Sequence, residues 1–327
     1  MILSNRDLVI LKQIELDAGL SIAEIAKRSR LHAHTVNYSI SKMREAGVLG
    51  QRRAAVNAYL LGFYDVHLIF SVASGDKARR EKFIAVLKDD PNVAWFAEIG
   101  GTHQFALSVR VSEIQEIFNF TERLATNFPN LISNQQLSIV NSVVSYGREY
   151  LYGKRKNKKK FTNRVEKSLK ISVDQIDYQI LKGLSGLSYG SERELARLLG
   201  LPFSTVRRRI TQLESDKVIT GYYHHIDPFK LGNQVFKLLV FAQRQDPAFS
   251  KKLESFASDH ENVVHCIEYL GSCQYELVVE VKEASLASNI AGMLRGIFDT
   301  QINDVHVIPI FRHFKANSFP GPQVNIN

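Results

Sequence analysis

The sequence predicts an α+β fold in which three short helices precede a βαββαβ arrangement, and this whole pattern occurs twice. The first observation is an internal repeat: a shift of 170 positions aligns Ile10-Leu11-Lys12 with Ile180-Leu181-Lys182, and Leu61-Gly62 with Leu231-Gly232, without a gap. The second is the helical spacing of apolar residues where each copy begins, and the third is an alternation of strand and helix patterns after it. A period of this length indicates a duplicated pair of domains rather than a solenoid.

The helical patterns are clearest in the second copy. Its second helix is expected to start at the capping box Ser191-x-x-Glu194, and a third helix is expected over residues 203–215. Val206, Ile210 and Leu213 fall on one face of that third helix and predict its buried side. The residues expected to point outward are Ser204, Arg207, Arg208, Thr211 and Gln212 in the second copy, and His34, Asn37, Tyr38, Ser41 and Lys42 in the first.

A tight turn between the second and third helices is typical of a helix-turn-helix, whose third helix can lie in the major groove of DNA. Arg, Asn and Gln can form paired hydrogen bonds to base edges, so the outward residues are candidate DNA contacts. A three-helix unit can also be a purely structural bundle. The second copy carries Arg207-Arg208-Arg209 on its third helix, which favours the DNA-binding interpretation.

The remainder of each copy reads as βαββαβ, a ferredoxin-like arrangement of two helices on one face of a four-stranded antiparallel sheet. The other face is rich in Val, Ile, Phe and Leu and needs a cover, for which the simplest candidate is the equivalent sheet of the other copy. The expected elements are 66–72, 77–88, 93–99, 105–111, 112–127 and 133–144 in the first copy, and 235–243, 247–258, 262–270, 274–281, 284–298 and 304–313 in the second.

The net charge of +9 is concentrated between the two copies. Residues 147–170 hold 10 basic and 2 acidic side chains, which predicts an exposed linker that attracts polyanions. The candidate phosphate contacts in it are Lys154, Arg155, Lys156, Lys158, Lys159 and Lys160. A solvated spacer without a partner is the alternative interpretation.

These patterns divide the chain into six segments. No apolar run approaches the length of a membrane span, and no secretion leader or disulfide framework is recognised, so a cytoplasmic location is expected. The predicted segments are helix-turn-helix units with their wings at 1–60 and 172–230, βαββαβ domains at 61–146 and 231–316, a basic linker at 147–171, and a flexible tail at 317–327.

The sequence resembles the Lrp/AsnC family of transcriptional regulators. The resemblance is closest at Glu194-Leu-Ala196, Ser204-Thr-Val206, Val218-Ile219-Thr-Gly221-Tyr222 and Asp227-Pro228-x-x-Leu231-Gly232. It implies a winged helix-turn-helix and a βαββαβ regulatory (RAM) domain per unit, with double-stranded DNA as partner and pairing through the regulatory domains. The chain then looks like two subunits fused into a single-chain pseudo-dimer that further forms homo-oligomers.

The same resemblance implies a small-molecule effector at the turn between the middle strands of the regulatory domain. The matching positions here are Gly101 to Gln104 and Gly271 to Gln274. Both copies lack the carboxylate that the family uses for an amino-acid ammonium group, so a structural turn is an equally good interpretation of each.

A decarboxylase is the alternative function. Siroheme decarboxylases share this architecture, and Arg52-Arg53-Ala-Ala-Val56 is loosely similar to their segment after the third helix. The sequence is nevertheless expected to encode no enzyme, and to need neither a cofactor nor a metal. Cys266, Cys273, His265 and His103 lack metal-ligand spacing and are interpreted as core residues, whereas His224-His225 are expected on the wing, near phosphate.

Overall fold

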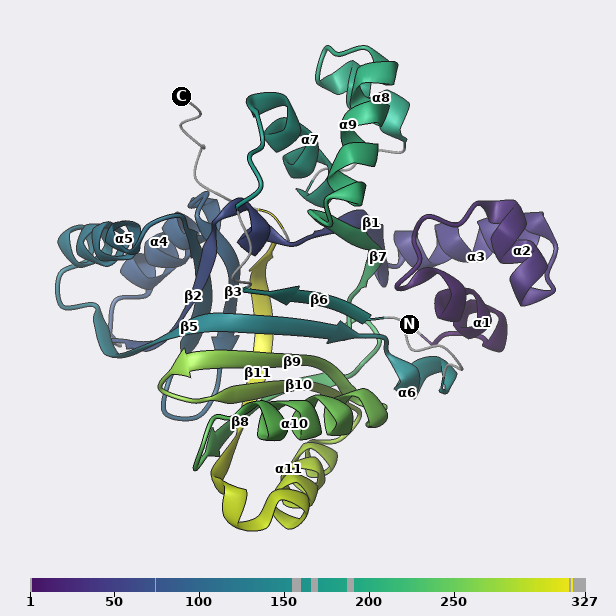
Figure 1. The fold of residues 1–327 in the computed structure, drawn as a ribbon. Coiled ribbons are helices and arrows are strands. Elements are labelled where there is room, and N and C mark those ends of the chain that lie inside the picture. The colour runs from purple at the N-terminus through teal and green to yellow at the C-terminus, as the bar shows by residue number, and fades with distance from the viewer. Residues whose placement is uncertain are drawn as a thin grey trace.

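The computed structural model describes residues 2–73, 75–154, 160–165, 170–186, 191–317 and 319. Two helical lobes lie beside a β-barrel that carries helices on its outer surface (Figure 1). The first copy consists of α1 (Asn5–Ile14), α2 (Ile22–Ser29), α3 (Ala33–Glu45), β1 (Leu49–Val56), η1 (Ala58–Leu61), β2 (Tyr64–Val72), α4 (Lys77–Asp89), β3 (Val93–Ile99), β4 (Phe105–Val111), α5 (Ile114–Asn127) and β5 (Ile132–Tyr146).

The second copy repeats the first, and its matched strands start 170 residues later, as at Tyr64 and Gln234. It consists of α7 (Gln175–Gly186), α8 (Glu192–Leu198), α9 (Phe203–Ser215), β7 (Ile219–Ile226), β8 (Gln234–Ala242), α10 (Pro247–Asp259), β9 (Val263–Gly271), β10 (Tyr275–Val281), α11 (Ala284–Phe298), η2 (Asp299–Gln301) and β11 (Ile302–Ala316). The predicted tandem α+β fold is therefore confirmed.

Each helical lobe is a winged helix-turn-helix. Capping boxes start α1 and α2, because Ser4 and Ser21 each exchange hydrogen bonds with the acidic residue three positions later. In the second lobe Ser191 accepts from the backbone of Glu194 at the start of α8, as the sequence predicts. The wing strands β1 and β7 pair with each other in an antiparallel two-stranded ribbon, so the two lobes are joined directly.

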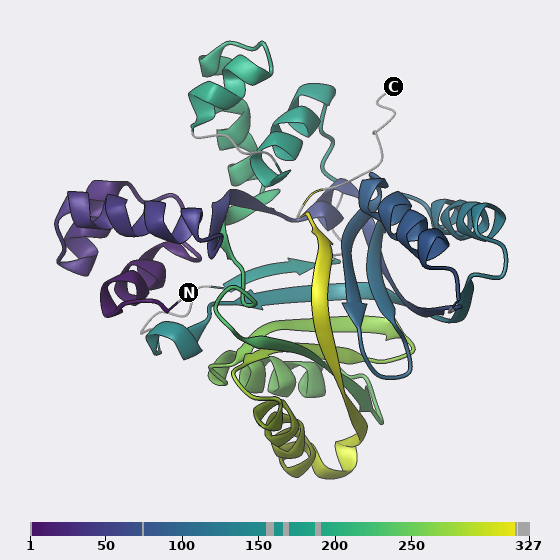
Figure 2. The same cartoon turned by 180° about the vertical axis from the view of Figure 1, so that it is seen from behind.

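The two βαββαβ sheets close into one barrel. Strand order runs β2-β4-β3-β11-β8-β10-β9-β5, and β5 pairs back to β2, which completes the ring. The seams between the copies are the pairs β3–β11 and β5–β9, and this closure removes the free edges that four-stranded sheets would expose. Figure 2 shows β11 running along the barrel from one copy to the other.

Strand residues alternate between two apolar environments. Val66, Leu68 and Phe70 of β2 face outward into the core beneath α4 and α5, whereas Ile69 faces the barrel interior. The interior is shared by both copies, and its apolar part includes Ala97, Ile99, Leu239, Ile308 and Ile310. The predicted cover of each sheet, the sheet of the other copy, is thus present, with the sheets joined at both edges.

The copies also exchange core residues. Val144 and Tyr146, at the end of β5, pack in the core beneath α10 and α11 of the second copy. Phe314, near the end of β11, packs in the core of the first copy. Ile226 and Leu231 of the second copy similarly join the core of the first helical lobe.

The segment predicted as an exposed linker is in part packed against the barrel. It forms α6 (Glu149–Tyr152), which contacts α1, and β6 (Lys160–Arg164), which pairs with β5. The prediction of an exposed linker over 147–171 is therefore wrong for these two elements, which pack against α1 and pair with β5. Residues 155–159 and 166–169, and most of the predicted tail, lie outside the described residues.

Candidate functional site

The third helix of each lobe buries its apolar stripe and exposes the opposite face. Val36, Ile40 and Met43 of α3 are buried, as are Val206, Ile210 and Leu213 of α9. Of the ten residues predicted to point outward, nine are exposed and Lys42 is half-buried. The exposed ones are His34, Asn37, Tyr38 and Ser41 on α3, and Ser204, Arg207, Arg208, Thr211 and Gln212 on α9.

Several of these side chains are held by partners within their own lobe. Arg207 forms an ion pair with Glu192 at 2.7 Å, and Gln212 donates to Asp216 at 3.0 Å. Arg209, the third of the run of arginines, reaches Asp174 at 2.7 Å and Asp177 at 3.0 Å. On α3, Lys42 lies 3.6 Å from buried Asp7.

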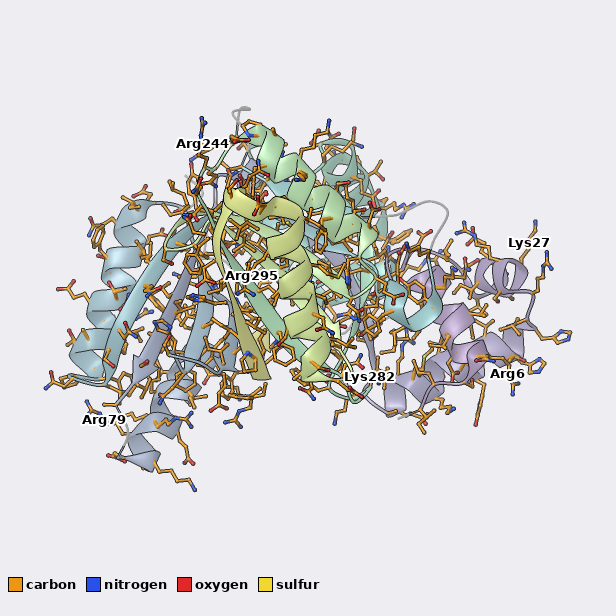
Figure 3. All side chains as sticks on the ribbon, turned by 90° about the horizontal axis from the view of Figure 1, so that it is seen from below. Arg6, Lys27, Arg79, Arg244, Lys282 and Arg295 are labelled. Atoms are coloured by element: carbon orange, nitrogen blue, oxygen red, sulfur yellow. The ribbon has the colours of Figure 1, made fainter. Side chains whose placement is uncertain are left out.

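Arg208 is exposed and has no ion pair among the described residues, so it is the guanidinium of α9 that is ready to contact another molecule. Arg207 is also exposed, but contact with DNA would compete with its bond to Glu192. Exposed cations on the first lobe include Arg6 and Lys27, which project from its outer surface (Figure 3).

The basic segment between the copies is described only at its two ends. Lys154 is exposed, and Lys160 lies 3.8 Å from Glu254, which also pairs with Arg164. The other four predicted phosphate contacts, Arg155, Lys156, Lys158 and Lys159, lie outside the described residues.

The two predicted effector turns share one hydrogen bond, although their glycines differ in backbone conformation. Gln104 accepts a hydrogen bond from the backbone of Val72 at 3.1 Å, and Gln274 accepts one from Ala242 at 3.0 Å. Gly101 and Gly271 have positive φ values of 84° and 150°. In each copy, therefore, the glutamine carbonyl group ties the turn to the neighbouring strand.

A cavity of about 360 Å³ lies between the barrel interior and the β1–β7 ribbon. Both copies and β6 contribute to its lining, and sequence reasoning did not predict it. The titratable and aromatic residues that line it are Glu15, Arg53, Tyr59, Asp65, His67, Trp95, Arg110, Tyr146, Arg148, Phe161, Tyr223, His224, His225, Lys237, His265, Tyr269, Glu276, Glu280 and His313.

Three of the four cations in this lining have carboxylate partners. Arg110 pairs with Asp65 at 2.8 Å, and Lys237 pairs with Glu276 at 2.9 Å. Arg148 bridges Glu15 of the first lobe at 2.9 Å and Glu280 of the barrel wall at 2.7 Å, with all three side chains largely buried. Each of these three buried cations therefore has at least one carboxylate partner.

Arg53 is the exception in the lining. It donates to the carbonyl oxygen of Ala316 at 3.0 Å and has no carboxylate within ion-pair distance among the described residues. Its positive charge is therefore available to an anion in the cavity.

The histidines of the cavity are neutral at physiological pH. Burial, followed by the charges of Arg148 and other neighbours, lowers the pKa of His265 to about 3 and that of His225 to about 4. Burial and Lys237 lower the pKa of His313 to about 4. His313 is exposed by surface area, but that surface faces the cavity, so the protein around it still disfavours the charged ring.

The expectation that His224 and His225 contact phosphate from the wing is wrong. Both lie on β7, but His224 is buried, with Nδ1 3.1 Å from the carbonyl oxygen of Gly50, and both rings line the cavity. His265 lines the cavity as well, whereas Cys266 and Cys273 are free and buried in the cores. Within the described residues, no group of three or more His, Cys, Asp or Glu could hold a metal ion.

One signal in the sequence could have indicated a polar interior, although not the cavity itself. His67, Lys237, His265 and Glu276 are titratable residues inside otherwise apolar strands, at positions that alternate with residues of the outer cores. Such residues are rarely buried without a partner, so their presence indicates a polar interior. Their convergence follows from the closure of the barrel, which the sequence pattern does not encode locally.

The fold and these sites define a winged helix-turn-helix protein with a closed ring of strands and a ligand-sized cavity. A family model described as winged helix-turn-helix DNA-binding matches residues 3–49. The Bkd operon transcriptional regulator of Pseudomonas aeruginosa is 30% identical over 112 residues, which are 34% of this chain and 73% of that protein. The transcriptional regulator LrpC of Bacillus subtilis is also 30% identical over 112 residues, 34% of this chain and 76% of that protein. The chain belongs to the Lrp/AsnC family of transcriptional regulators.

A solved structure matches the fold over nearly the whole chain. The siroheme decarboxylase NirDL, in complex with an iron-uroporphyrin III analogue, has a TM-score of 0.60 and 14% identity, and the match covers 96% of this chain and 93% of that one. The expectation that the chain is not an enzyme is contradicted by this match, because the fold that it shares from end to end is that of an enzyme. No helix in the described parts of the chain has the length and apolar character of a membrane span.

Proposed function

We propose that the chain is a DNA-binding transcriptional regulator in which one polypeptide supplies both helix-turn-helix units of a pseudo-dimer. The observation that carries this proposal is the exposed face of the third helix in each lobe, above a buried apolar stripe. The pairing of β1 with β7, and of β3 with β11, supports a pair formed within one chain.

The two reading helices differ in chemistry, so the two half-sites are expected to differ. Arg208 on α9 can pair with guanine, whereas Asn37 on α3 can pair with adenine. The half-site beneath α9 is then richer in G·C. Arg6, Lys27 and the basic segment, with Lys154 at its start, would add contacts to phosphate that do not depend on sequence.

Selection of binding sites from random DNA by the full chain tests this proposal. We expect an asymmetric consensus whose half-site centres lie about 10 base pairs, or a multiple of that, apart. A perfectly symmetric consensus would contradict the single-chain pseudo-dimer, and no enrichment at all would contradict DNA binding. Association of chains into larger oligomers, a small-molecule effector and a cytoplasmic location stay predictions.

A second candidate function is the decarboxylation of a tetrapyrrole carboxylate in the barrel cavity. It is favoured by the unpaired cation Arg53 among cavity histidines, together with the ligand carried by the structural neighbour. In such a reaction a carbon–carbon bond breaks, carbon dioxide leaves, and a proton takes its place on the carbon. Arg53 would hold a carboxylate, and the neutral imidazoles would supply N–H donors around it.

Mass spectrometry after incubation of the purified chain with siroheme tests the second candidate. Loss of carbon dioxide from siroheme, at a rate that falls in an Arg53→Ala variant, is expected. Unchanged siroheme would rule out this reaction and leave the DNA-binding proposal untouched, because the two proposals use different parts of the molecule.

A further inference from the structure

Phe319 lies in the segment that the sequence predicts as a flexible tail, yet its side chain is only 1% exposed. The ring meets Phe63 edge to face with centroids 6.2 Å apart, and it meets Tyr178 in the same way at 5.5 Å. Phe63 directly precedes β2 of the first copy, whereas Tyr178 belongs to α7 of the second lobe. Phe319 therefore belongs to the fold, and it lies between the barrel and the second lobe.

The backbone beside Phe319 is held by hydrogen bonds. The N–H of Asn317 donates to the carbonyl oxygen of Ala94 on β3 at 2.8 Å, and the N–H of Phe319 donates to Asn317 Oδ1 at 3.2 Å. A Cβ atom on Gly186, at the end of α7, would lie 3.5 Å from the same oxygen. Asn317 and Phe319, which we call the β11 strap because they follow that strand, thus contact both the barrel and the second lobe.

The Phe319 ring is part of the core beneath the second lobe. That core combines buried residues of α7, α8 and α9 with Val56 and Ala58 of the first copy. On the barrel side, the guanidinium of Arg110, which pairs with Asp65 at 2.8 Å, lies 6.0 Å from the centre of the ring. Removal of the ring would leave a space between lobe and barrel, so the lobe would lose apolar contacts that hold it in position.

The first copy holds its own lobe at the matched place by different chemistry. The shift of 170 residues aligns Asn317 with Gly147 and Phe319 with Glu149. Between those two residues, Arg148 bridges Glu15 of the first lobe and Glu280 of the barrel wall. Each lobe is therefore attached through residues that directly follow the last strand of its own sheet. The attachment of the first lobe is ionic and that of the second is aromatic, so one can be weakened without the other.

We propose that the β11 strap fixes the second reading lobe relative to the first, with Phe319 as the positioning residue, and thereby sets the half-site spacing that the chain accepts on DNA. The β1–β7 ribbon joins the lobes, but a two-stranded ribbon alone supports a fixed geometry poorly. The strap adds an attachment between α7 and the barrel. The consequence for spacing rests on the proposed DNA-binding function, whereas the attachment itself does not.

Hydrogen exchange of the full chain, followed by mass spectrometry, tests the attachment. Phe319→Ala is expected to speed exchange in α7 by about tenfold or more, because truncation of a buried aromatic ring weakens the packing that protects the helix. Exchange in α1 should stay unchanged, since Arg148 is intact. Phe311→Ala is the matched control: it makes the same change on β11 at a ring that is 60% exposed, and it should leave α7 unchanged.

DNA binding tests the consequence for spacing. Two duplexes are compared, one with the selected half-site spacing and one with the same half-sites moved two base pairs further apart. The unaltered chain and Phe311→Ala are expected to prefer the selected spacing by about tenfold or more, and Phe319→Ala to lower that preference to within about threefold. A general loss of stability would weaken binding to both duplexes equally and leave the ratio of affinities as it was.

Unchanged exchange of α7 in Phe319→Ala would overturn the attachment, and an unchanged ratio of affinities would overturn the role in spacing. Thermal unfolding checks that each variant is folded. If Phe319→Ala does not fold, Phe319→Leu takes its place, and smaller changes in the same direction are expected. Absence of DNA binding by the unaltered chain would contradict the proposed function and the spacing consequence with it, while the exchange of α7 would still decide whether the strap holds the lobe.

Discussion

Lys237 Nζ lies 3.2 Å from His67 Nε2 across the interior of the barrel, although the two residues occupy matched positions of the repeat. The ammonium group must donate, so His67 Nε2 accepts, and His67 Nδ1 faces Ser108 Oγ at 3.2 Å. Burial and Lys237 hold the pKa of His67 well below its usual value, which keeps that ring neutral. An exact repeat would put two buried lysines or two histidines here, and two ammonium groups at this distance would repel strongly.

The ion pair of Lys237 with Glu276 predicts a specific pattern of stability. Glu276→Leu leaves a buried ammonium without its carboxylate and is expected to lower the free energy of unfolding by about 3–5 kcal/mol. The double variant Lys237→Met/Glu276→Leu removes both charges and should recover most of that loss. Urea denaturation of the three variants, with Lys237→Met alone as the third, measures the coupling. Additive losses would contradict the pairing.

Arg148 predicts a mechanical link between the first lobe and the barrel. Arg148→Ala leaves Glu15 and Glu280 buried without their shared cation, so we expect a loss of about 3–5 kcal/mol and faster hydrogen exchange in α1. Arg164→Ala is the control, because its pair with Glu254 is half-exposed and worth about 0–1 kcal/mol. Unchanged exchange in α1 would show that the lobe is held by other contacts.

The buried histidines predict that stability falls in mild acid. In the folded chain the pKa of His224 is about 4 and that of His265 about 3, below the unfolded value of about 6.5. The unfolded state therefore binds more protons in this window, so stability is full above about pH 6.5 and is lost as the pH falls toward 4. Urea midpoints measured across that range should decline, and His224→Asn should flatten the decline. A slope that the variant does not change would contradict the buried neutral ring.

Neighbouring arginines of α9 are expected to behave differently when replaced. Arg208→Ala should weaken binding to a selected site by about 1–3 kcal/mol without changing stability, because this exposed side chain is a candidate base contact. Arg209→Ala should instead lower stability, since it removes the partner of Asp174 and Asp177. Gel-shift titration and thermal melts of both variants distinguish the roles. Equal DNA affinity for Arg208→Ala and the unaltered chain would contradict the hypothesis that α9 contacts the bases.

Local patterns predicted most of the fold. The capping boxes at Ser21 and Ser191 and the apolar spacing of Val206, Ile210 and Leu213 define helices within a few residues, so the helical lobes follow from neighbouring positions. The βαββαβ order also follows from local patterns, because strand patterns and helix patterns alternate along the chain. The linker prediction failed at β6. This strand is rich in polar and charged residues, so its sequence is typical of solvent-exposed chain. Only its pairing with β5 and the packing of the Phe161 ring against Gly221 show that it belongs to the fold.

The cavity was beyond local reasoning. His265, Lys237 and His313 come from three strands of the second copy's sheet, and the seams β3–β11 and β5–β9 bring residues of the first copy, such as His67, around the same space. Each residue alone is an isolated polar interruption in an apolar run. Predicting the site needs the register between strands far apart in the sequence, which is set by tertiary packing rather than by propensity.

The ends of β5 and β11 each pack in the core of the other copy. We therefore expect the two copies to stay associated even when the peptide connection between them is cut. Tyr146 is anchored in the second copy and Phe314 in the first, so a chain cut by trypsin in the basic segment should remain one particle until it is denatured. The peptide connection fixes which copies pair, because every first copy is synthesised in the same polypeptide as a second copy. Free halves could assemble like with like and would face Lys237 with Lys237. Covalent continuity therefore allows the two halves to diverge, since neither must remain compatible with a copy of itself.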